Sequence, residues 1–485
     1  MKILLNILIL IVVFLVILGY GTDTEENEQA VATPAPSPGA AAPTDPFPFP
    51  FMHDLIQMPP SERPQPPNDD WSEFSVENAE WLLSRLDEVL KRDNGTLWGV
   101  NLRAPFMIVN AFTRDVVANM PDNNGNLEKQ GDVYTGTLHE TALIGTTATK
   151  VYDRWWGMMT WGFIDDFSDD LDYVVQVMVH ELFHAWQFEL FEGERRLQNN
   201  AHMDELDARI SVRMEVNALM KALEATGFDR LAAIKDALSI RAERRRNFDS
   251  AALEENLFEI SEGTAVYTDL MLTININELR NIITYMELFI EKQIHGQSMR
   301  TFGYTTGALY GFLLDELGAD WKQGLRFDSD LGVLLQEAAG ISELTPFENL
   351  DLELYGYSEI TAFETEWLDY YERLLREANE IFNETLLRIT SDGEIRDWNP
   401  DYAQVLHLQG REVAFYGRFS FKGDFGRLIV NDGFLLLGRT TSYYEISARN
   451  IETEGNRLVG LGWVIELNDD YELREAGDFY YIDKS

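Results

Sequence analysis

The sequence contains no cysteine and few histidines, and basic residues are scarce relative to acidic ones. Without cysteine there is no disulfide, no thiolate metal ligand and no cysteine nucleophile, so a metal must be bound by histidine or carboxylate side chains. The chain has 39 basic and 82 acidic residues, a formal net charge of −43. Such a charge repels nucleic acid and anionic membrane surfaces, so we expect no nucleic-acid partner.

Proline is scarce except in one segment near the N-terminus. Of the 16 prolines, 12 lie between Pro34 and Pro67, among alanine, serine and threonine. This composition cannot pack into a core and predicts an extended tether over residues 22–70.

The first 21 residues have the pattern of a targeting segment. Lys2 precedes an apolar run from Ile3 to Gly19 that only Asn6 interrupts. This predicts a cleaved signal peptide or an uncleaved membrane anchor. Tyr20 stands where a lipoprotein cleavage box would carry its cysteine, which excludes lipidation there. We therefore expect the protein outside the cytoplasmic membrane, either secreted or tethered to its outer face.

The remaining sequence predicts an α+β protein in three parts. Residues 71–170 combine an amphipathic helix, Ser75–Arg92, with short alternating runs that indicate a small, mostly antiparallel sheet, whose last extended segment continues to Phe163. Residues 390–485 are rich in strand patterns and predict a separate C-terminal β domain. Between them, residues 171–389 predict helices over 171–191, 204–225, 229–246, 251–272, 277–295, 305–317 and 359–387.

The segment His180-Glu181-Leu182-Phe183-His184 is the strongest indication of function. Histidines four positions apart lie on one face of a helix, one turn apart, where both imidazoles can reach one zinc ion. Glu181, between them, can face the same site and act as a general base. The flanking residues are mostly apolar, as expected for a buried metal-binding helix.

A hydrolytic zinc site has three protein ligands and one open position, so a third ligand must come from elsewhere. Glu262 is the first candidate, since it lies on a predicted helix and Gly263 after it allows a second helix to approach closely. Glu215 is the alternative, because it also lies on a predicted helix and is only 215 − 184 = 31 positions beyond His184.

Around Glu262 the sequence resembles the gluzincins, zinc peptidases with an HExxH helix and a glutamate third ligand. Glu262, Gly263, Ala265 and Tyr267 match the Glu-Gly-x-Ala-x-Tyr context of the aminopeptidase N branch. The resemblance implies a zincin-like core in which His180, His184 and Glu262 bind Zn²⁺ and Glu181 is the base.

A second segment, Tyr304-Thr-Thr-Gly-Ala308, is similar to the Tyr-x-Lys-Gly-Ala helix of the same branch. There the tyrosine donates a hydrogen bond to the oxyanion, which implies this role for Tyr304. The alternative interpretation of Tyr304 is an ordinary aromatic residue at the start of a helix.

The sequence departs from that branch at three points. Thr306 replaces the usual lysine, and the interval from His184 to Glu262, 262 − 184 = 78 positions, is far longer than usual. Thr160 stands where the glutamate of Gly-x-Met-Glu-Asn would bind a substrate's amino terminus. A hydroxyl cannot pair with an ammonium group, which argues against aminopeptidase specificity.

Together these features predict an exported or membrane-anchored zinc metallopeptidase acting on peptides or proteins. Two alternatives remain open at this point. One is an inactive zincin-like scaffold that serves as a binding module of the cell envelope. The other is a zinc hydrolase that acts on a substrate other than a peptide.

Overall fold

The structure, a computed structural model, describes residues 65–111, 113–139, 142, 144–195, 200–274, 283, 285–287, 290, 299–390, 396–399, 404–408, 413–437, 443–477 and 479–484. The expected targeting segment, nearly all of the tether and most of the helix expected over 277–295 lie outside these residues. Within the described ranges, no helix has the length and hydrophobicity that crossing a bilayer requires.

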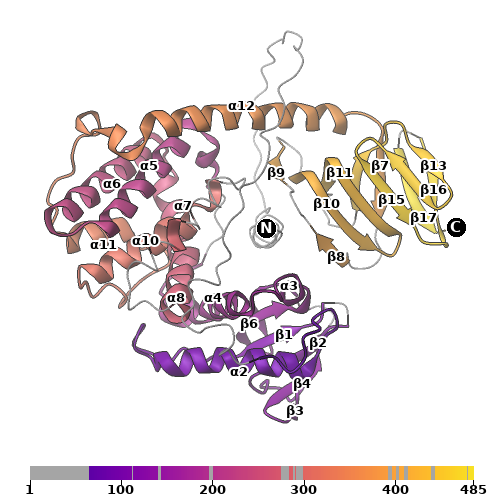
Figure 1. Cartoon of the computed structure of the whole chain (residues 1–485), viewed down its shortest axis with the longest axis horizontal. Coiled ribbons are helices and arrows are strands. Elements are labelled where there is room, and N and C mark those ends of the chain that lie inside the picture. The colour runs from indigo at the N-terminus through magenta and orange to yellow at the C-terminus, as the bar shows by residue number, and fades with distance from the viewer. Residues whose placement is uncertain are drawn as a thin grey trace, which may run out of the picture.

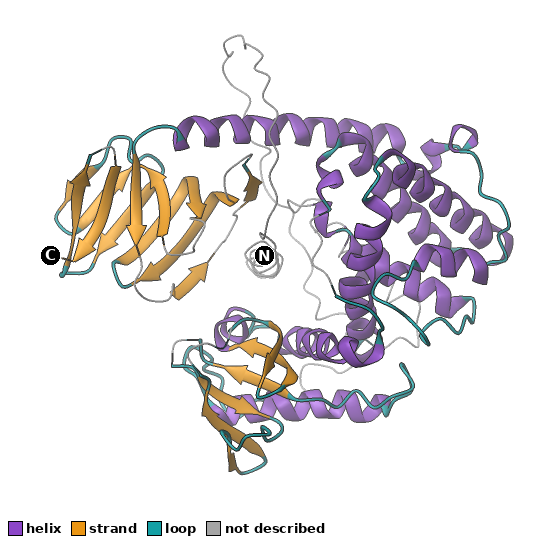
Figure 2. Ribbon diagram, turned by 180° about the vertical axis from the view of Figure 1, so that it is seen from behind, coloured by secondary structure: helices purple, strands orange, loops and turns teal. Residues whose placement is uncertain are grey.

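The described chain is an α+β protein in which a helical region is followed by β structure (Figures 1 and 2). Its first part is helix α2 (Val76–Asp93) and a six-stranded sheet. Ser75 begins α2 as predicted, because its side chain accepts a hydrogen bond from the Asn78 backbone N–H. The strands are β1 (Phe106–Val109), β2 (Asp115–Ala118), β3 (Glu128–Gln130), β4 (Val133–Thr137), β5 (Thr147–Val151) and β6 (Arg154–Thr160).

This sheet has the order β3-β4-β2-β1-β6-β5. Only the β1–β6 pair is parallel, which confirms the mostly antiparallel prediction. The extended segment that we expected to continue to Phe163 instead ends at Thr160, and helix α3 (Trp161–Asp166) follows. Burial explains the change, since the helix places Trp161, Phe163 and Ile164 in the core.

The helical part begins with α4 (Leu171–Leu190), which packs against β6. The close approach depends on Gly157 in β6. A Cβ atom there would lie 2.5 Å from the Phe106 ring and 3.0 Å from the Leu182 Cα. The helices with described bounds that follow are η3 (Ala201–Asp204), α5 (Leu206–Glu224), α6 (Gly227–Asn247), α7 (Ala251–Phe258), η4 (Glu259–Gly263), α8 (Thr264–Thr273), η5 (Met299–Thr301), α10 (Gly303–Glu316), α11 (Leu331–Ala338), η6 (Phe347–Asn349), η7 (Leu352–Tyr355) and α12 (Tyr357–Phe382).

The C-terminal part is a second sheet, and its main path has the order β13-β14-β15-β11-β12-β7-β17-β16. Strand β10 pairs with β11, β8 and β9 beside this path. The strands are β7 (Leu386–Thr390), β8 (Arg396–Asn399), β9 (Gln404–His407), β10 (Val413–Gly423), β11 (Gly426–Leu437), β12 (Tyr443–Ser447), β13 (Glu452–Glu454), β14 (Arg457–Gly460), β15 (Trp463–Leu467), β16 (Tyr471–Ala476) and β17 (Phe479–Lys484).

The last helix is shorter than predicted, because α12 ends at Phe382 and not near Leu387. Leu387 and Ile389 are fully buried and flank the less buried Arg388, the alternation of a strand. They belong to β7, so the second sheet begins before residue 390.

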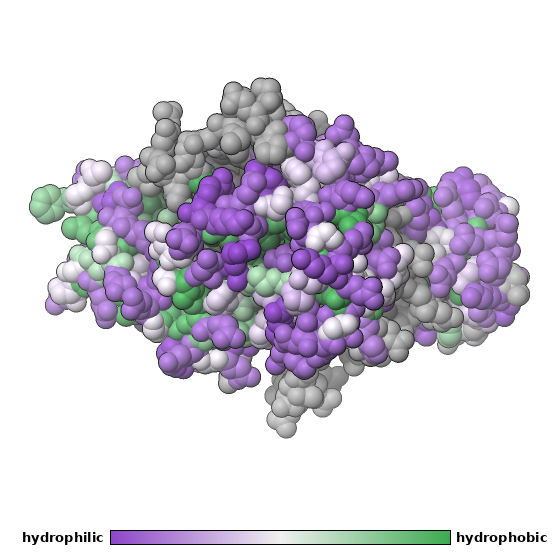
Figure 3. Space-filling view, turned by 90° about the horizontal axis from the view of Figure 1, so that it is seen from below, coloured by the Kyte–Doolittle hydropathy of each residue, from purple (hydrophilic) through white to green (hydrophobic). Residues whose placement is uncertain are grey.

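Helix α12 connects the helical region with the second sheet (Figure 1). Seen from below, the described surface is mainly hydrophilic with scattered apolar side chains, as the acidic composition predicts (Figure 3).

Candidate metal centre

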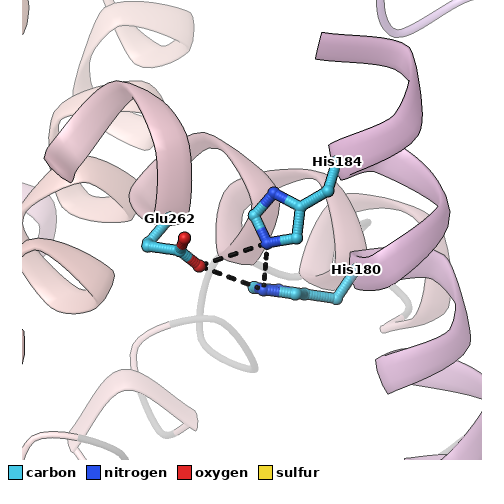
Figure 4. A group of neighbouring side chains, drawn as sticks. All are labelled: His180, His184 and Glu262. Carbon is cyan, nitrogen blue, oxygen red and sulfur yellow. Dashed lines mark hydrogen bonds and ion pairs between the residues drawn. The ribbon is translucent and has the colours of Figure 1, made fainter. Parts of the chain in front are cut away.

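Three buried side chains from two segments converge in the core, and Figure 4 shows how they face one another. His180 and His184 come from α4, and Glu262 comes from η4. The two Nε2 atoms are 3.1 Å apart, and Glu262 Oε2 lies 3.2 Å from His184 Nε2 and 3.6 Å from His180 Nε2. Among the described residues this is the one cluster of His, Asp and Glu side chains arranged to hold a metal ion.

The spacing of these donor atoms fits a small tetrahedral cation. Bonds of about 2.0–2.1 Å to nitrogen and oxygen place tetrahedral ligand atoms about 3.3 Å apart. The observed separations of 3.1, 3.2 and 3.6 Å are close to that value. Two imidazole nitrogens and a carboxylate without sulfur are also a donor set that zinc accepts.

Each histidine has a hydrogen-bond partner on its outer nitrogen. His180 Nδ1 lies 3.0 Å from Asp269 Oδ2, and Asp269 Oδ1 accepts a 2.8 Å hydrogen bond from Gln176. His184 Nδ1 lies 3.0 Å from Gln187 Oε1. Such partners fix the orientation of metal-binding imidazoles. Neither partner was predicted from the sequence, although Gln187 follows His184 by three positions and Asp269 follows Glu262 by seven, spacings that return to one helix face.

Glu262 is positioned by a close crossing of two helices. Segment η4 is a π-helix between α7 and α8, and it packs against α10. A Cβ atom on Gly263 would lie 2.5 Å from the Gly307 Cα, so both positions require glycine. The close approach expected at Gly263 is therefore present. A π-helix interrupting an α-helix is common at functional sites.

The second oxygen of Glu262 is also held. Its Oε1 accepts hydrogen bonds from Arg195 Nη2 at 2.9 Å and from Ser261 Oγ at 3.2 Å. The carboxylate thus presents Oε2 to the histidines, while Oε1 faces a cation. Arg195 was not predicted from the sequence, because it follows α4 in the chain and belongs to no motif.

Tyr304 lies beside the cluster at the start of α10. Its ring is nearly parallel to the His180 ring, with centroids 6.1 Å apart and an interplanar angle of 24°. The residue is buried, and its hydroxyl has no hydrogen-bond partner among the described residues. Burial and the nearby Glu262 and Glu181 raise its pKa well above 10, so it is a neutral hydrogen-bond donor.

The ionisable groups have strongly shifted pKa values in the protein chain alone. Burial raises the pKa of Glu181 to about 7, with His180 opposing this shift and Glu262 adding to it. Burial would lower the pKa of His180, but hydrogen bonds to Asp269 and Glu262 raise it to about 10. Perturbed pKa values of this size in one buried cluster are typical of functional sites.

The alternative ligand, Glu215, is not part of this cluster. It is fully buried and pairs with Arg241 Nη1 at 3.1 Å and Arg244 Nη1 at 2.6 Å. It also accepts a hydrogen bond from the Tyr310 hydroxyl. Its carboxylate is thus neutralised by two arginines inside the helical region.

Thr306 and Thr160, which differ from the gluzincin pattern, each contact another polar side chain. Thr306 Oγ1 donates a 2.7 Å hydrogen bond to Glu259, the first residue of η4. Thr160 ends β6, and its hydroxyl lies 3.4 Å from that of Thr146.

A scan of protein-family models, a search of curated proteins and a search of solved structures find no match to this chain. The assignment of a function therefore depends on the motifs and on the geometry of the cluster.

Proposed function

We propose that the protein is a zinc-dependent peptidase of the gluzincin type, with a zincin-like core. The observation that carries this proposal is the convergence of His180, His184 and Glu262, with the buried Glu181 between the two histidines in the sequence. The second supporting observation is the unpartnered hydroxyl of Tyr304 beside the same cluster.

In this proposal His180, His184 and Glu262 hold the metal ion. Zinc bound there would supply a Lewis acid and lower the pKa of water towards neutrality. Glu181 accepts the proton of the attacking water and then gives it to the leaving amine. The Tyr304 hydroxyl donates a hydrogen bond to the oxyanion that develops on the peptide carbonyl, without adding charge to the site.

The substrates in this proposal are peptides or proteins outside the cytoplasmic membrane, which the N-terminal targeting pattern supports. Thr160 at the end of β6 lacks the charge that would bind an amino terminus, which favours an activity other than that of an aminopeptidase.

Replacing Glu181 with glutamine tests the proposed chemistry. We expect E181Q to bind zinc as the wild type does and to lose about 10²–10⁴-fold in kcat on a peptide library, because the amide cannot take a proton. Glu189, an exposed glutamate on the same helix, provides the control, and E189Q should retain full activity. Normal cleavage by E181Q would refute the mechanism. Zinc binding without cleavage of any peptide by the wild type would favour the two alternatives, a non-peptide substrate or an inactive scaffold.

A further inference from the structure

Gln187 is a fully buried residue of α4 whose side-chain amide makes four polar contacts. Its Oε1 lies 3.0 Å from His184 Nδ1. Its Nε2 donates to the carbonyl oxygens of Ile260 at 3.2 Å and Ser261 at 2.6 Å, and it lies 3.0 Å from Thr264 Oγ1. One amide therefore contacts both a metal-site histidine and the segment that carries Glu262.

These contacts determine the orientation of the Gln187 side-chain amide. Carbonyl oxygens only accept hydrogen bonds, so the group that faces Ile260 and Ser261 must be the NH₂ of Gln187. Thr264 Oγ1 is free to accept as well, because its own proton goes to the Ile260 carbonyl. Oε1 of Gln187 must then face His184.

The direction of the amide in turn determines the tautomer of His184. An oxygen at Gln187 Oε1 can only accept, so Nδ1 of His184 carries the proton. In the neutral ring, the lone pair is then on Nε2, the atom that faces His180 and Glu262. A metal requires this arrangement, because only a deprotonated ring nitrogen can be a ligand.

The donor side of the amide holds η4 in place. In a π-helix the backbone hydrogen bonds span five residues, so the carbonyls beside the insertion differ in direction from those of an α-helix. Gln187 contacts the carbonyls of Ile260 and Ser261, the two residues immediately before Glu262. Thr264, its third contact, is the first residue of α8. The amide therefore links α4 to the backbone on both sides of the third ligand.

We propose that Gln187 is a positioning residue that sets the tautomer of His184 and the distance between the two ligand-bearing segments. Gln187 accepts a hydrogen bond from Nδ1 of His184, as Asp269 does from Nδ1 of His180. Unlike Asp269, it also has an NH₂ group, which donates to the backbone of η4. The inference rests on the metal site of the proposed function and does not depend on the substrate.

The affinity for zinc, measured by chelator competition without substrate, tests this proposal. We expect Q187L to bind zinc about 10–100-fold more weakly than the wild type, as for other residues that orient metal ligands. Q187E keeps the acceptor for His184 Nδ1 but places an oxygen against the Ile260 and Ser261 carbonyls in place of the NH₂, so it should also bind zinc more weakly than the wild type. Urea unfolding of each variant in chelator gives the stability separately.

Asn78 provides a matched control, since its buried amide also bonds to backbone groups, the N–H and carbonyl of Asn68, at 3.0 and 2.9 Å. N78L should lower stability and leave zinc affinity within twofold of the wild type. Zinc affinity of Q187L within twofold of the wild type would show a purely structural role and overturn the proposal.

If Q187L does not fold, the zinc affinities of Q187E and N78L are compared to test the proposal. Q187E overturns the proposal if it binds zinc as N78L does, and supports it if it binds more weakly. A wild-type protein that binds no zinc refutes the proposed function before any variant is compared. A wild type that binds zinc but cleaves no peptide refutes the peptidase and leaves the role of Gln187 intact.

Discussion

Glu181 is a carboxyl group in a buried position beside a second acid, Glu262. Burial raises its pKa from 4.5 to about 7, so the folded chain disfavours the ionised form that the unfolded chain adopts at neutral pH. The group to which the proposal assigns the proton transfer is thus also one that destabilises the fold, which is a common compromise at active sites.

The stability of E181Q should therefore exceed that of the wild type at high pH. Below about pH 4.5 the carboxyl group is protonated in both the folded and the unfolded state, so the raised pKa does not change the free energy of unfolding. Above about pH 7 the raised pKa lowers the free energy of unfolding by its full amount. A shift of this size corresponds to about 3 kcal/mol. Urea unfolding in chelator should show E181Q about 3 kcal/mol more stable at pH 8 and equal to the wild type at pH 4. An equal difference at both pH values would contradict this account.

Sequence reasoning predicted the residues that the structure brings together, but not the residues that orient them. His180, His184, Glu262 and Tyr304 belong to motifs with characteristic spacing, and they lie in one cluster. The partners of these groups depend on which helix faces are adjacent in the fold. Arg195 in particular has no recognisable context in the chain, and only the fold brings it to within 2.9 Å of Glu262 Oε1.

Among the elements, the crossing of η4 and α10 determines where Glu262 lies. The two segments touch through Gly263 and Gly307, and a Cβ atom on Gly307 would lie 2.7 Å from the Glu259 carbonyl oxygen and from the Gly263 Cα. Both are backbone atoms, so the segments would have to move apart.

We expect G307A to lower the free energy of unfolding by about 1–3 kcal/mol and to weaken zinc binding, because η4 is displaced. Gly162 in α3 is a suitable control, since a Cβ atom there meets no other atom within 4 Å. G162A should be neutral or stabilise by up to about 1 kcal/mol. Thermal unfolding and zinc competition measure both effects. Unchanged zinc affinity in a destabilised G307A would show that the crossing does not position Glu262.

The π-helix could not be predicted, whereas the elements on either side of it could. Residues 251–272 have a continuous helical pattern of apolar residues. A single π-helical turn adds one residue and does not visibly interrupt that pattern. The first residue of the π-helix, Glu259, pairs with Arg241 and accepts a hydrogen bond from Thr306, tertiary contacts that the sequence pattern does not indicate. Boundaries such as the end of α12 were also misplaced, because Leu386 and Leu387 suit a helix as well as a strand.

At the scale of the whole molecule, α12 connects two separate cores. Its 26 residues span about 39 Å. Glu364 near its start pairs with Arg209 and Arg213 of α5. Phe382 at its end packs in a cluster with Leu406 and Phe434 of the second sheet. The order of helical and β regions and the long helix between them were predicted from pattern alone, but the contacts of that helix with both cores were not.

F382A should therefore destabilise the second sheet without disturbing the cluster of His180, His184 and Glu262. Removing the buried ring is expected to destabilise by about 3–5 kcal/mol. Limited proteolysis should show earlier cleavage after α12, with zinc content unchanged, because the cluster of Phe382 is separate from the core around α4. L354A, at a residue that is 56% exposed, should change stability by less than about 0.5 kcal/mol. Loss of zinc from F382A would contradict the independence of the two cores.

The most direct test of the account is the metal content of the purified protein and of one variant. We predict one zinc ion per chain in the wild type by elemental mass spectrometry, and E262Q should lose most of it after dialysis against a weak chelator. A wild-type protein with no bound metal, or an E262Q variant that retains zinc as the wild type does, would contradict the proposed centre.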